Sequence, residues 1–127
     1  MIAVDTSALM AIVLHEVPGK ACMAALRADD RLFISAGTVA EALIVAHRRY
    51  AGEKMQMLIE GLGFEIVPVT AAQAFRVGEA HARWGKGAKS AGLNFGDCFS
   101  YVLAKENGCA LLYVGKDFAR TDVRGVI

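Results

Sequence analysis

Residues 1–14, MIAVDTSALMAIVL, place one apolar run directly before an aspartate and a second apolar run directly after a Thr-Ser pair. The first run, residues 1–4, is typical of a short buried strand, and residues 8–14 are typical of a buried helix. The polar residues between them are suited to cap the start of that helix. We therefore predict that the chain begins with a strand, a cap and a helix.

The same alternation of strand and helix continues along the rest of the chain. Further strands are predicted over residues 32–35, 64–69 and 109–114, and further helices over residues 18–28, 38–50, 53–62, 71–84 and 94–107. Pro68 indicates that the third strand either lies at a sheet edge or ends there, and residues 120–127 are expected to add one short strand. Strands separated by helices predict a mostly parallel, four- to five-stranded sheet covered on both faces. We expect a single domain over residues 1–127.

The composition excludes several classes of protein. With 55% hydrophobic and 21% charged residues, the chain is not disordered, and no apolar run approaches the roughly 20 residues needed to cross a bilayer. We expect a cytoplasmic protein without a membrane anchor or an organic cofactor. The net charge of +1 gives no general attraction for nucleic acid, so any polyanion must bind to local basic patches. The three cysteines form no CxxC pair, which predicts buried free thiols.

Four acidic residues that are far apart in the sequence are predicted to lie at one edge of the sheet. Asp5 follows the first strand, Glu41 lies early in the helix after the second, Asp97 begins the last helix, and Asp117 follows the fourth strand. Ligands of open parallel sheets bind beyond the carboxyl ends of the strands. Helix capping explains each acid separately, but carboxylates about 4 Å apart repel one another by roughly 4 kcal/mol per pair. A cluster of four therefore requires cations.

Hard divalent cations with oxygen ligands would neutralise such a cluster, and Mg²⁺ or Mn²⁺ is the natural candidate. We predict Asp5 and Asp97 as the principal metal ligands, with Glu41 and Asp117 completing the catalytic site. This arrangement suits phosphodiester hydrolysis, in which one ion activates a water molecule and a second stabilises the leaving oxygen.

Other polar residues are candidates for supporting roles. Thr6, Ser7 and Asn94 are placed to hydrogen-bond the ligands or a phosphate, although helix capping is their more common role. Basic residues suited to contact phosphates lie on one helix and around a glycine-rich loop. They are Arg48, Arg49, Arg76, Arg83, Lys86 and Lys89.

Four segments together resemble PIN-domain ribonucleases, and most of all the VapC-type toxins of bacterial toxin–antitoxin pairs. They are IAVDTSAL at residues 2–9, TVAE at 38–41, LNFGDCF at 93–99, and GKDF at 115–118 with Thr121 and Asp122. The resemblance spans the whole chain and implies a three-layer, Rossmann-like α/β/α fold. It also implies a Mg²⁺- or Mn²⁺-dependent endoribonuclease that a cognate antitoxin neutralises. Lys116 stands where relatives often carry Asn or an acid, so Asp122 is an alternative to Asp117.

Two other functions remain open from the sequence. A receiver-like phosphoacceptor domain also gathers acids at strand ends beside a lysine such as Lys116, but the third predicted strand is followed by no Asp. A catalytically idle PIN-like binding module would keep the acidic edge for structure alone.

The high apolar content favours a surface patch for a partner, either a second copy in a homodimer or the antitoxin. We expect a groove between two sets of helices to receive an amphipathic segment. Its predicted lining is Leu9, Met10, Val13, Leu43, Met55 and Leu58.

Overall fold

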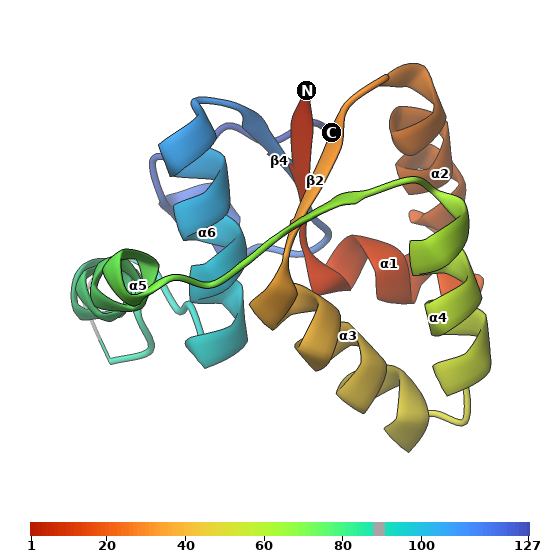
Figure 1. Ribbon diagram of the computed structural model, residues 1–127, viewed down its shortest axis with the longest axis horizontal. Coiled ribbons are helices and arrows are strands. Elements are labelled where there is room, and N and C mark those ends of the chain that lie inside the picture. The colour runs from red at the N-terminus through yellow and green to blue at the C-terminus, as the bar shows by residue number, and fades with distance from the viewer. Residues whose placement is uncertain (88–90) are drawn as a thin grey trace.

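The computed structural model describes residues 1–87 and 91–127, which form a four-stranded sheet with helices on both faces (Figure 1). The strands are β1 (Ile2–Val4), β2 (Leu32–Ser35), β3 (Glu65–Val67) and β4 (Ala110–Leu112). The helices are α1 (Thr6–Val13), α2 (Gly19–Ala28), α3 (Ala36–Arg48), α4 (Gly52–Gly61), α5 (Ala71–Trp84) and α6 (Phe95–Asn107), with a short 3-10 helix, η1 (Phe118–Arg120). The predicted elements agree with these bounds to within about two residues.

All pairs of neighbouring strands are parallel, and the strand order is β3-β2-β1-β4. The expectation drawn from Pro68 is confirmed on both counts, because β3 lies at the edge of the sheet and ends at Val67, directly before the proline that has no N–H to donate. β1 lies between β2 and β4, and the backbone N–H of Asp5 donates to the Leu112 carbonyl at 3.0 Å. The carboxyl ends of β1 and β4 therefore lie side by side.

Side chains along the strands alternate between two hydrophobic cores. Ile2 and Val4 pack with the helices α1 to α4, whereas Ala3 packs on the opposite face with α5 and α6. In β2, Ile34 and Phe33 divide between the cores in the same way. Because strand residues point alternately to opposite faces, this pattern produces a helical layer on each side of the sheet (Figure 1). The predicted three-layer α/β/α arrangement is confirmed.

The strand predicted over residues 120–127 is wrong. The tail contains η1 and a single parallel bridge between Leu111 and Gly125, so the described chain has four strands, the lower of the two numbers predicted. Only two backbone hydrogen bonds join the tail to Leu111, from the Leu111 N–H to the Arg124 carbonyl and from the Val126 N–H to the Leu111 carbonyl. Such a short pairing holds the tail without extending into a ladder.

The predicted docking groove between the early helices is also wrong. α1 packs directly against both α3 and α4, so the apolar faces of these helices already cover one another. The buried side chains are Leu9, Met10, Val13 and Met55, and Leu43 and Leu58 pack against the same core. These residues follow the helical spacing of a core-facing stripe, which a sequence cannot distinguish from a binding face.

Cys22, Cys98 and Cys109 are buried free thiols, as predicted. None of the helices in residues 1–87 and 91–127 combines the length and hydropathy that crossing a bilayer requires.

Tyr50 follows the C-cap residue of α3, Arg49, in a left-handed backbone conformation with φ +57°, and its side chain is fully exposed. Glycine normally occupies this position after a helix, because other residues pay about 1 to 2 kcal/mol for the conformation. Tyr50→Gly is therefore expected to raise the free energy of unfolding by about 1 kcal/mol, or the Tm by roughly 4 °C. Thermal denaturation followed by circular dichroism measures this change. Tyr50→Ala is the matched control and should give no increase, and an equal increase in both variants would contradict the explanation.

Candidate active site

Asp5 caps α1 from the carboxyl end of β1, and its side chain is almost completely buried, with 2% exposed. Its Oδ2 accepts hydrogen bonds from the Ser7 backbone N–H at 3.0 Å and the Ser7 hydroxyl at 2.7 Å. Its Oδ1 accepts a hydrogen bond from the Ser100 hydroxyl of α6 at 2.6 Å. Burial raises the pKa of Asp5 above its usual value, and these donors oppose that rise.

Glu41 projects from α3 toward the first turn of α6. Its Oε1 accepts a hydrogen bond from the Thr6 hydroxyl at 2.6 Å, which ties it to the start of α1. On its other side the carboxylate lies against Gly96, where a Cβ atom would overlap Oε2. Burial, followed by the negative charge of Asp5, raises the pKa of Glu41. Glu41 therefore lies between the starts of α1 and α6, close enough to Asp5 for their charges to interact.

Asp97 belongs to a capping box at the start of α6. Its backbone N–H donates to Asn94 Oδ1 at 2.8 Å, and its Oδ2 accepts from the Asn94 backbone N–H at 3.0 Å. Its pKa is raised to about 7, chiefly by burial and further by the negative charges of Asp5, Glu41 and Asp117. The negative charges of the other three predicted acids thus all act on Asp97.

Asp117 and Asp122 occupy different environments. Asp117 immediately precedes η1, is exposed, and contributes its charge to the group around Asp97. Asp122 accepts a hydrogen bond from the Tyr101 hydroxyl and pairs with Lys105 at 3.3 Å, and the Tyr101 bond is the first cause of its lowered pKa. Of the two alternatives left open by the sequence, Asp122 is engaged by Tyr101 and Lys105 whereas Asp117 acts on Asp97 through its charge, and the choice of Asp117 as a ligand stays a prediction.

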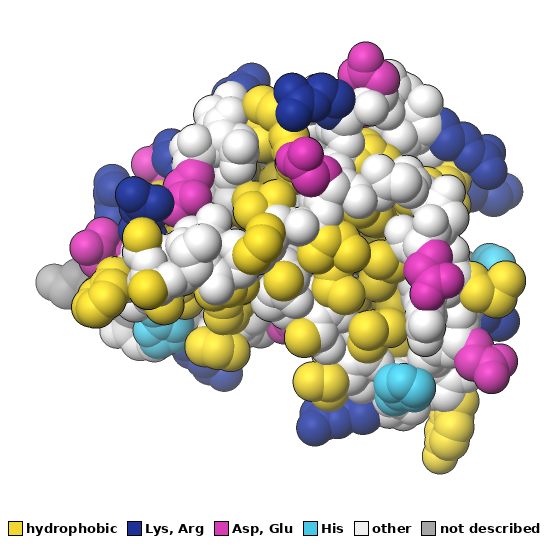
Figure 2. All heavy atoms as spheres, in the orientation of Figure 1, with side chains coloured by type: hydrophobic (Ala, Val, Ile, Leu, Met, Phe, Trp, Pro, Cys, Tyr) yellow, Lys and Arg dark blue, Asp and Glu magenta, His cyan; other side chains and the backbone are white. Residues whose placement is uncertain are grey.

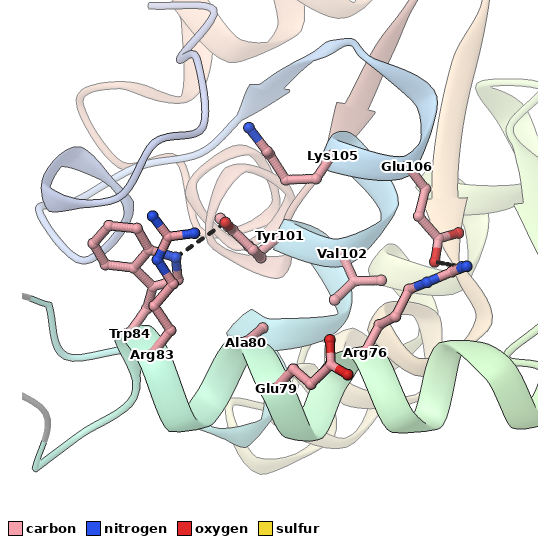
Figure 3. Close-up of a pocket in the computed structure, with 9 residues that line it drawn as sticks. All are labelled: Arg76, Glu79, Ala80, Arg83, Trp84, Tyr101, Val102, Lys105 and Glu106. Carbon is pink, nitrogen blue, oxygen red and sulfur yellow. Dashed lines mark hydrogen bonds and ion pairs between the residues drawn. The ribbon is translucent and has the colours of Figure 1, made fainter.

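A separate pocket of about 250 Å³ lies between α5 and α6 (Figure 3). Trp84 donates its indole N–H to the Tyr101 hydroxyl at 3.0 Å, and the Arg83 guanidinium lies over the Trp84 ring. Arg76 forms an ion pair with Glu106 at the other end of the pocket. Because Tyr101 also donates to Asp122, the network at this pocket extends to that carboxylate.

The acidic group has no basic partner in the described part of the chain. The ion pairs found there join the N-terminus to Asp29, Arg76 to Glu106 and Lys105 to Asp122. Nor do three acidic, His or Cys side chains in residues 1–87 and 91–127 already stand together as a metal-binding group. Carboxylates whose negative charges raise the pKa of Glu41 and Asp97 nevertheless fit a divalent cation, because oxygen ligands and unbalanced negative charge are what such ions require.

Of the predicted supporting polar residues, one caps a helix and two form hydrogen bonds with the acidic residues. Asn94 caps α6, as its more common role predicted. Thr6 and Ser7 do not cap α1, because Asp5 takes that position, and their hydroxyls donate instead to Glu41 and Asp5. The capping role expected for these two residues is wrong.

Sequence reasoning missed Ser100 and Thr38, two fully buried polar residues whose hydroxyls lie 3.2 Å apart. Ser100 donates directly to Asp5. Each stands three residues from a predicted acid, Ser100 after Asp97 and Thr38 before Glu41, which places it on the same helix face. This spacing was a usable signal for both residues.

The predicted phosphate contacts lie outside the acidic group. Arg48 and Arg49 are exposed at the end of α3, about 10 Å of helix rise beyond Glu41. Lys86 is exposed after α5, where its backbone N–H donates to the Leu93 carbonyl at 2.9 Å. Lys89 lies outside the described residues. Their contact with RNA stays a prediction.

The raised pKa of Asp97 predicts how stability depends on pH in the absence of metal. An unfolded Asp loses its proton near pH 3.8, whereas folded Asp97 keeps it up to about pH 7. In this window the folded state binds more protons than the unfolded state, so the free energy of unfolding should fall as the pH rises, by up to about 1.4 kcal/mol per pH unit. Urea denaturation with chelator from pH 4 to 8, compared with Asp97→Asn, isolates this group. A difference between the two proteins that stays constant over that range would contradict the assignment.

Comparison with known proteins defines the class to which this fold and acidic group belong. Residues 2–124 match the model of the PIN domain, and the chain belongs to the PIN domain family. Ribonuclease VapC30 of Mycobacterium tuberculosis is 37% identical over 126 residues, covering 97% of this chain and 96% of the relative. Ribonuclease VapC of Mycolicibacterium smegmatis is 38% identical, with 97% and 98% covered. The resemblance to VapC-type proteins is confirmed over nearly the full length.

Solved structures confirm the fold. Mycobacterium tuberculosis VapC20, a toxin that cleaves the sarcin-ricin loop, superposes with a TM-score of 0.80 at 16% identity, covering 97% of this chain and 96% of that one. The VapBC2 complex of Rickettsia felis, bound to a DNA fragment from its promoter, gives a TM-score of 0.71 at 20% identity, with 98% and 97% covered. At these identities the likeness establishes the PIN fold.

Proposed function

We propose that this chain is a divalent-metal-dependent endoribonuclease and the toxin of a toxin–antitoxin pair. The observation that carries the proposal is the group of Asp5, Glu41, Asp97 and Asp117 at the carboxyl edge of the sheet, whose negative charges act together on Asp97. Its membership of the PIN family and its relatives named as ribonucleases support RNA as the substrate. None of the relatives named above is a receiver-like signalling domain.

The four acidic side chains would have different roles in such a site. Asp5 and Asp97 are held by hydrogen bonds to fixed positions and would be the principal metal ligands, with Glu41 and Asp117 beside them. A bound Mg²⁺ or Mn²⁺ would supply an activated water molecule and stabilise charge on the phosphate. The negative edge repels a phosphate until cations neutralise it, so metal and RNA are expected to bind in that order.

Incubation of the purified protein with total cellular RNA tests this function. Discrete cuts are expected with Mn²⁺ or Mg²⁺, and none with chelator, when the cleaved ends are mapped by sequencing. Uncut RNA in the presence of either metal, at protein concentrations equal to those of the RNA, would refute the nuclease. A catalytically idle binding module would give that result.

We further propose a cytoplasmic protein that forms a homodimer and binds a cognate antitoxin. Several large apolar side chains are exposed, and one face shows hydrophobic side chains gathered around α3 and α4 (Figure 2). The exposed apolar side chains include Ile44 of α3, with 56% exposed, and Met57 of α4, with 72% exposed. Apolar surface of this kind favours a protein partner. Light scattering after size-exclusion chromatography should give twice the mass of the chain, and a monomer at micromolar concentration would contradict the dimer.

A further inference from the structure

A chain of hydroxyl groups links α3 to Asp5 through α6. The Ser100 hydroxyl donates to Asp5 Oδ1 at 2.6 Å, and the Thr38 hydroxyl lies 3.2 Å from Ser100 Oγ. A hydroxyl has one proton, and Ser100 uses its own on Asp5, so Thr38 must donate to Ser100. Both hydroxyl-bearing side chains are fully buried, which excludes water as a substitute donor from bulk solvent.

The two carboxylate oxygens of Asp5 differ in how many lone pairs they have left to bind a further partner. Oδ2 accepts two hydrogen bonds from Ser7, one from the backbone N–H and one from the hydroxyl. The Ser7 hydroxyl is fixed in turn, because its oxygen accepts from the Val114 backbone N–H at 3.0 Å. A carboxylate oxygen has two lone pairs, so Oδ2 is fully used, whereas Oδ1 accepts one hydrogen bond from Ser100 and keeps a lone pair.

We propose that Ser100, held by Thr38, is a positioning residue that fixes Asp5 so that Oδ1 alone is presented to a divalent cation. This inference rests on the proposed metal-dependent function and adds to it the atom that binds and the residues that orient it. Ser7 holds one side of the carboxylate and Ser100 the other, so the group cannot rotate. Partners that orient a ligand in this way change metal affinity by about 10- to 100-fold when they are removed.

Variants of Ser100 and Thr38 distinguish this positioning role from a contribution to the stability of the fold. Ser100→Ala leaves Oδ1 without its donor and lets the carboxylate turn about its Cβ bond. Thr38→Val keeps the shape of the side chain and removes only the hydroxyl, whereas Thr38→Ser keeps the hydroxyl and removes a methyl group. If Thr38 had only a structural role, Thr38→Ser would weaken metal binding at least as much as Thr38→Val, because the missing methyl group in Thr38→Ser leaves a cavity. A positioning role predicts the reverse order for metal binding.

Isothermal titration of Mn²⁺ into the RNA-free protein measures the effect directly, with the Tm in chelator as the check of folding. Ser100→Ala is expected to weaken Mn²⁺ binding by about 10- to 100-fold. Thr38→Val should weaken it by about fivefold, the value of one neutral hydrogen bond, and Thr38→Ser should bind within twofold of the wild type.

Two outcomes overturn the inference in distinguishable ways. If the wild type binds Mn²⁺ and Ser100→Ala and Thr38→Val bind it equally well, the positioning role is wrong and the proposed function stands. If the wild type itself binds no Mn²⁺, the metal-dependent function fails and the inference fails with it. Should Ser100→Ala not fold, the order of the two Thr38 variants decides: weaker binding by Thr38→Val supports the role, and equal or stronger binding refutes it.

Discussion

Asp97→Asn is expected to lose RNA cleavage by at least about 1000-fold, equivalent to a rise of about 4 kcal/mol in the reaction barrier. The substitution removes the charge at the centre of the acidic group, where Asp5, Glu41 and Asp117 all act. The fold should survive, because an Asn oxygen can still accept from the Asn94 backbone N–H that now donates to Asp97. Loss of the buried charge should leave the Tm in chelator at pH 7.5 equal to or above that of the wild type.

Cleavage of a labelled RNA under single-turnover conditions measures this effect. Asp5→Asn should also lose cleavage, because its amide oxygen can keep the cap of α1 whereas its NH2 group carries no charge and cannot accept the hydrogen bond from Ser100. Asp30→Asn is the matched control, because Asp30 is exposed in the turn before β2 and takes no part in the acidic group. Cleavage by folded Asp97→Asn at the rate of the control would remove Asp97 from the catalytic site.

Gly96→Ala is expected to reduce cleavage by about 100-fold while leaving the fold intact. A Cβ atom at this position would overlap the Glu41 carboxylate, which lies at the end of a flexible side chain and can move away. Moving it would break the hydrogen bond from Thr6 and displace Glu41 from the acidic group. Misplacing a reacting group by about 1 Å is enough for a loss of this size.

Gly78→Ala provides the matched control for this prediction. Gly78 lies in the middle of α5, and a Cβ atom there would meet nothing within 4 Å. The substitution should raise the free energy of unfolding by about 0.5 to 1 kcal/mol without changing cleavage, because Ala has a higher helix propensity than Gly. If Gly96→Ala cleaves RNA as fast as Gly78→Ala, the close contact between Gly96 and Glu41 has no part in the function.

The sequence predicted the fold well because each element carries a local signal. Apolar runs mark β1 and β2. Thr70 and Asn94 are the N-caps of α5 and α6, and they mark where these two helices begin. The bounds of α5 were predicted to the residue for this reason. The tail lacked such signals, since a single bridge at Gly125 has neither the length nor the alternation of a strand.

The candidate site was predicted in part. The four acids could be predicted to lie near one another because parallel topology places the carboxyl ends of neighbouring strands together, which requires no knowledge of side-chain contacts. The hydrogen bond from Ser100 to Asp5 could not be predicted in this way, because topology places residues at the sheet edge without fixing which side chains bond, and only the spacing of Ser100 from Asp97 pointed to it. The prediction of a docking groove was wrong for a different reason. Apolar residues such as Leu9 and Met55 have the same spacing whether they face a partner or their own core.

The most direct test of the account is a crystal structure of the protein with Mn²⁺, read from the anomalous scattering of the metal. We predict a peak at the carboxyl edge of the sheet, with Asp5 Oδ1 and the Asp97 carboxylate among its ligands. A structure at saturating Mn²⁺ with no peak beside either residue would contradict the claim that these remote carboxylates converge to bind a divalent cation.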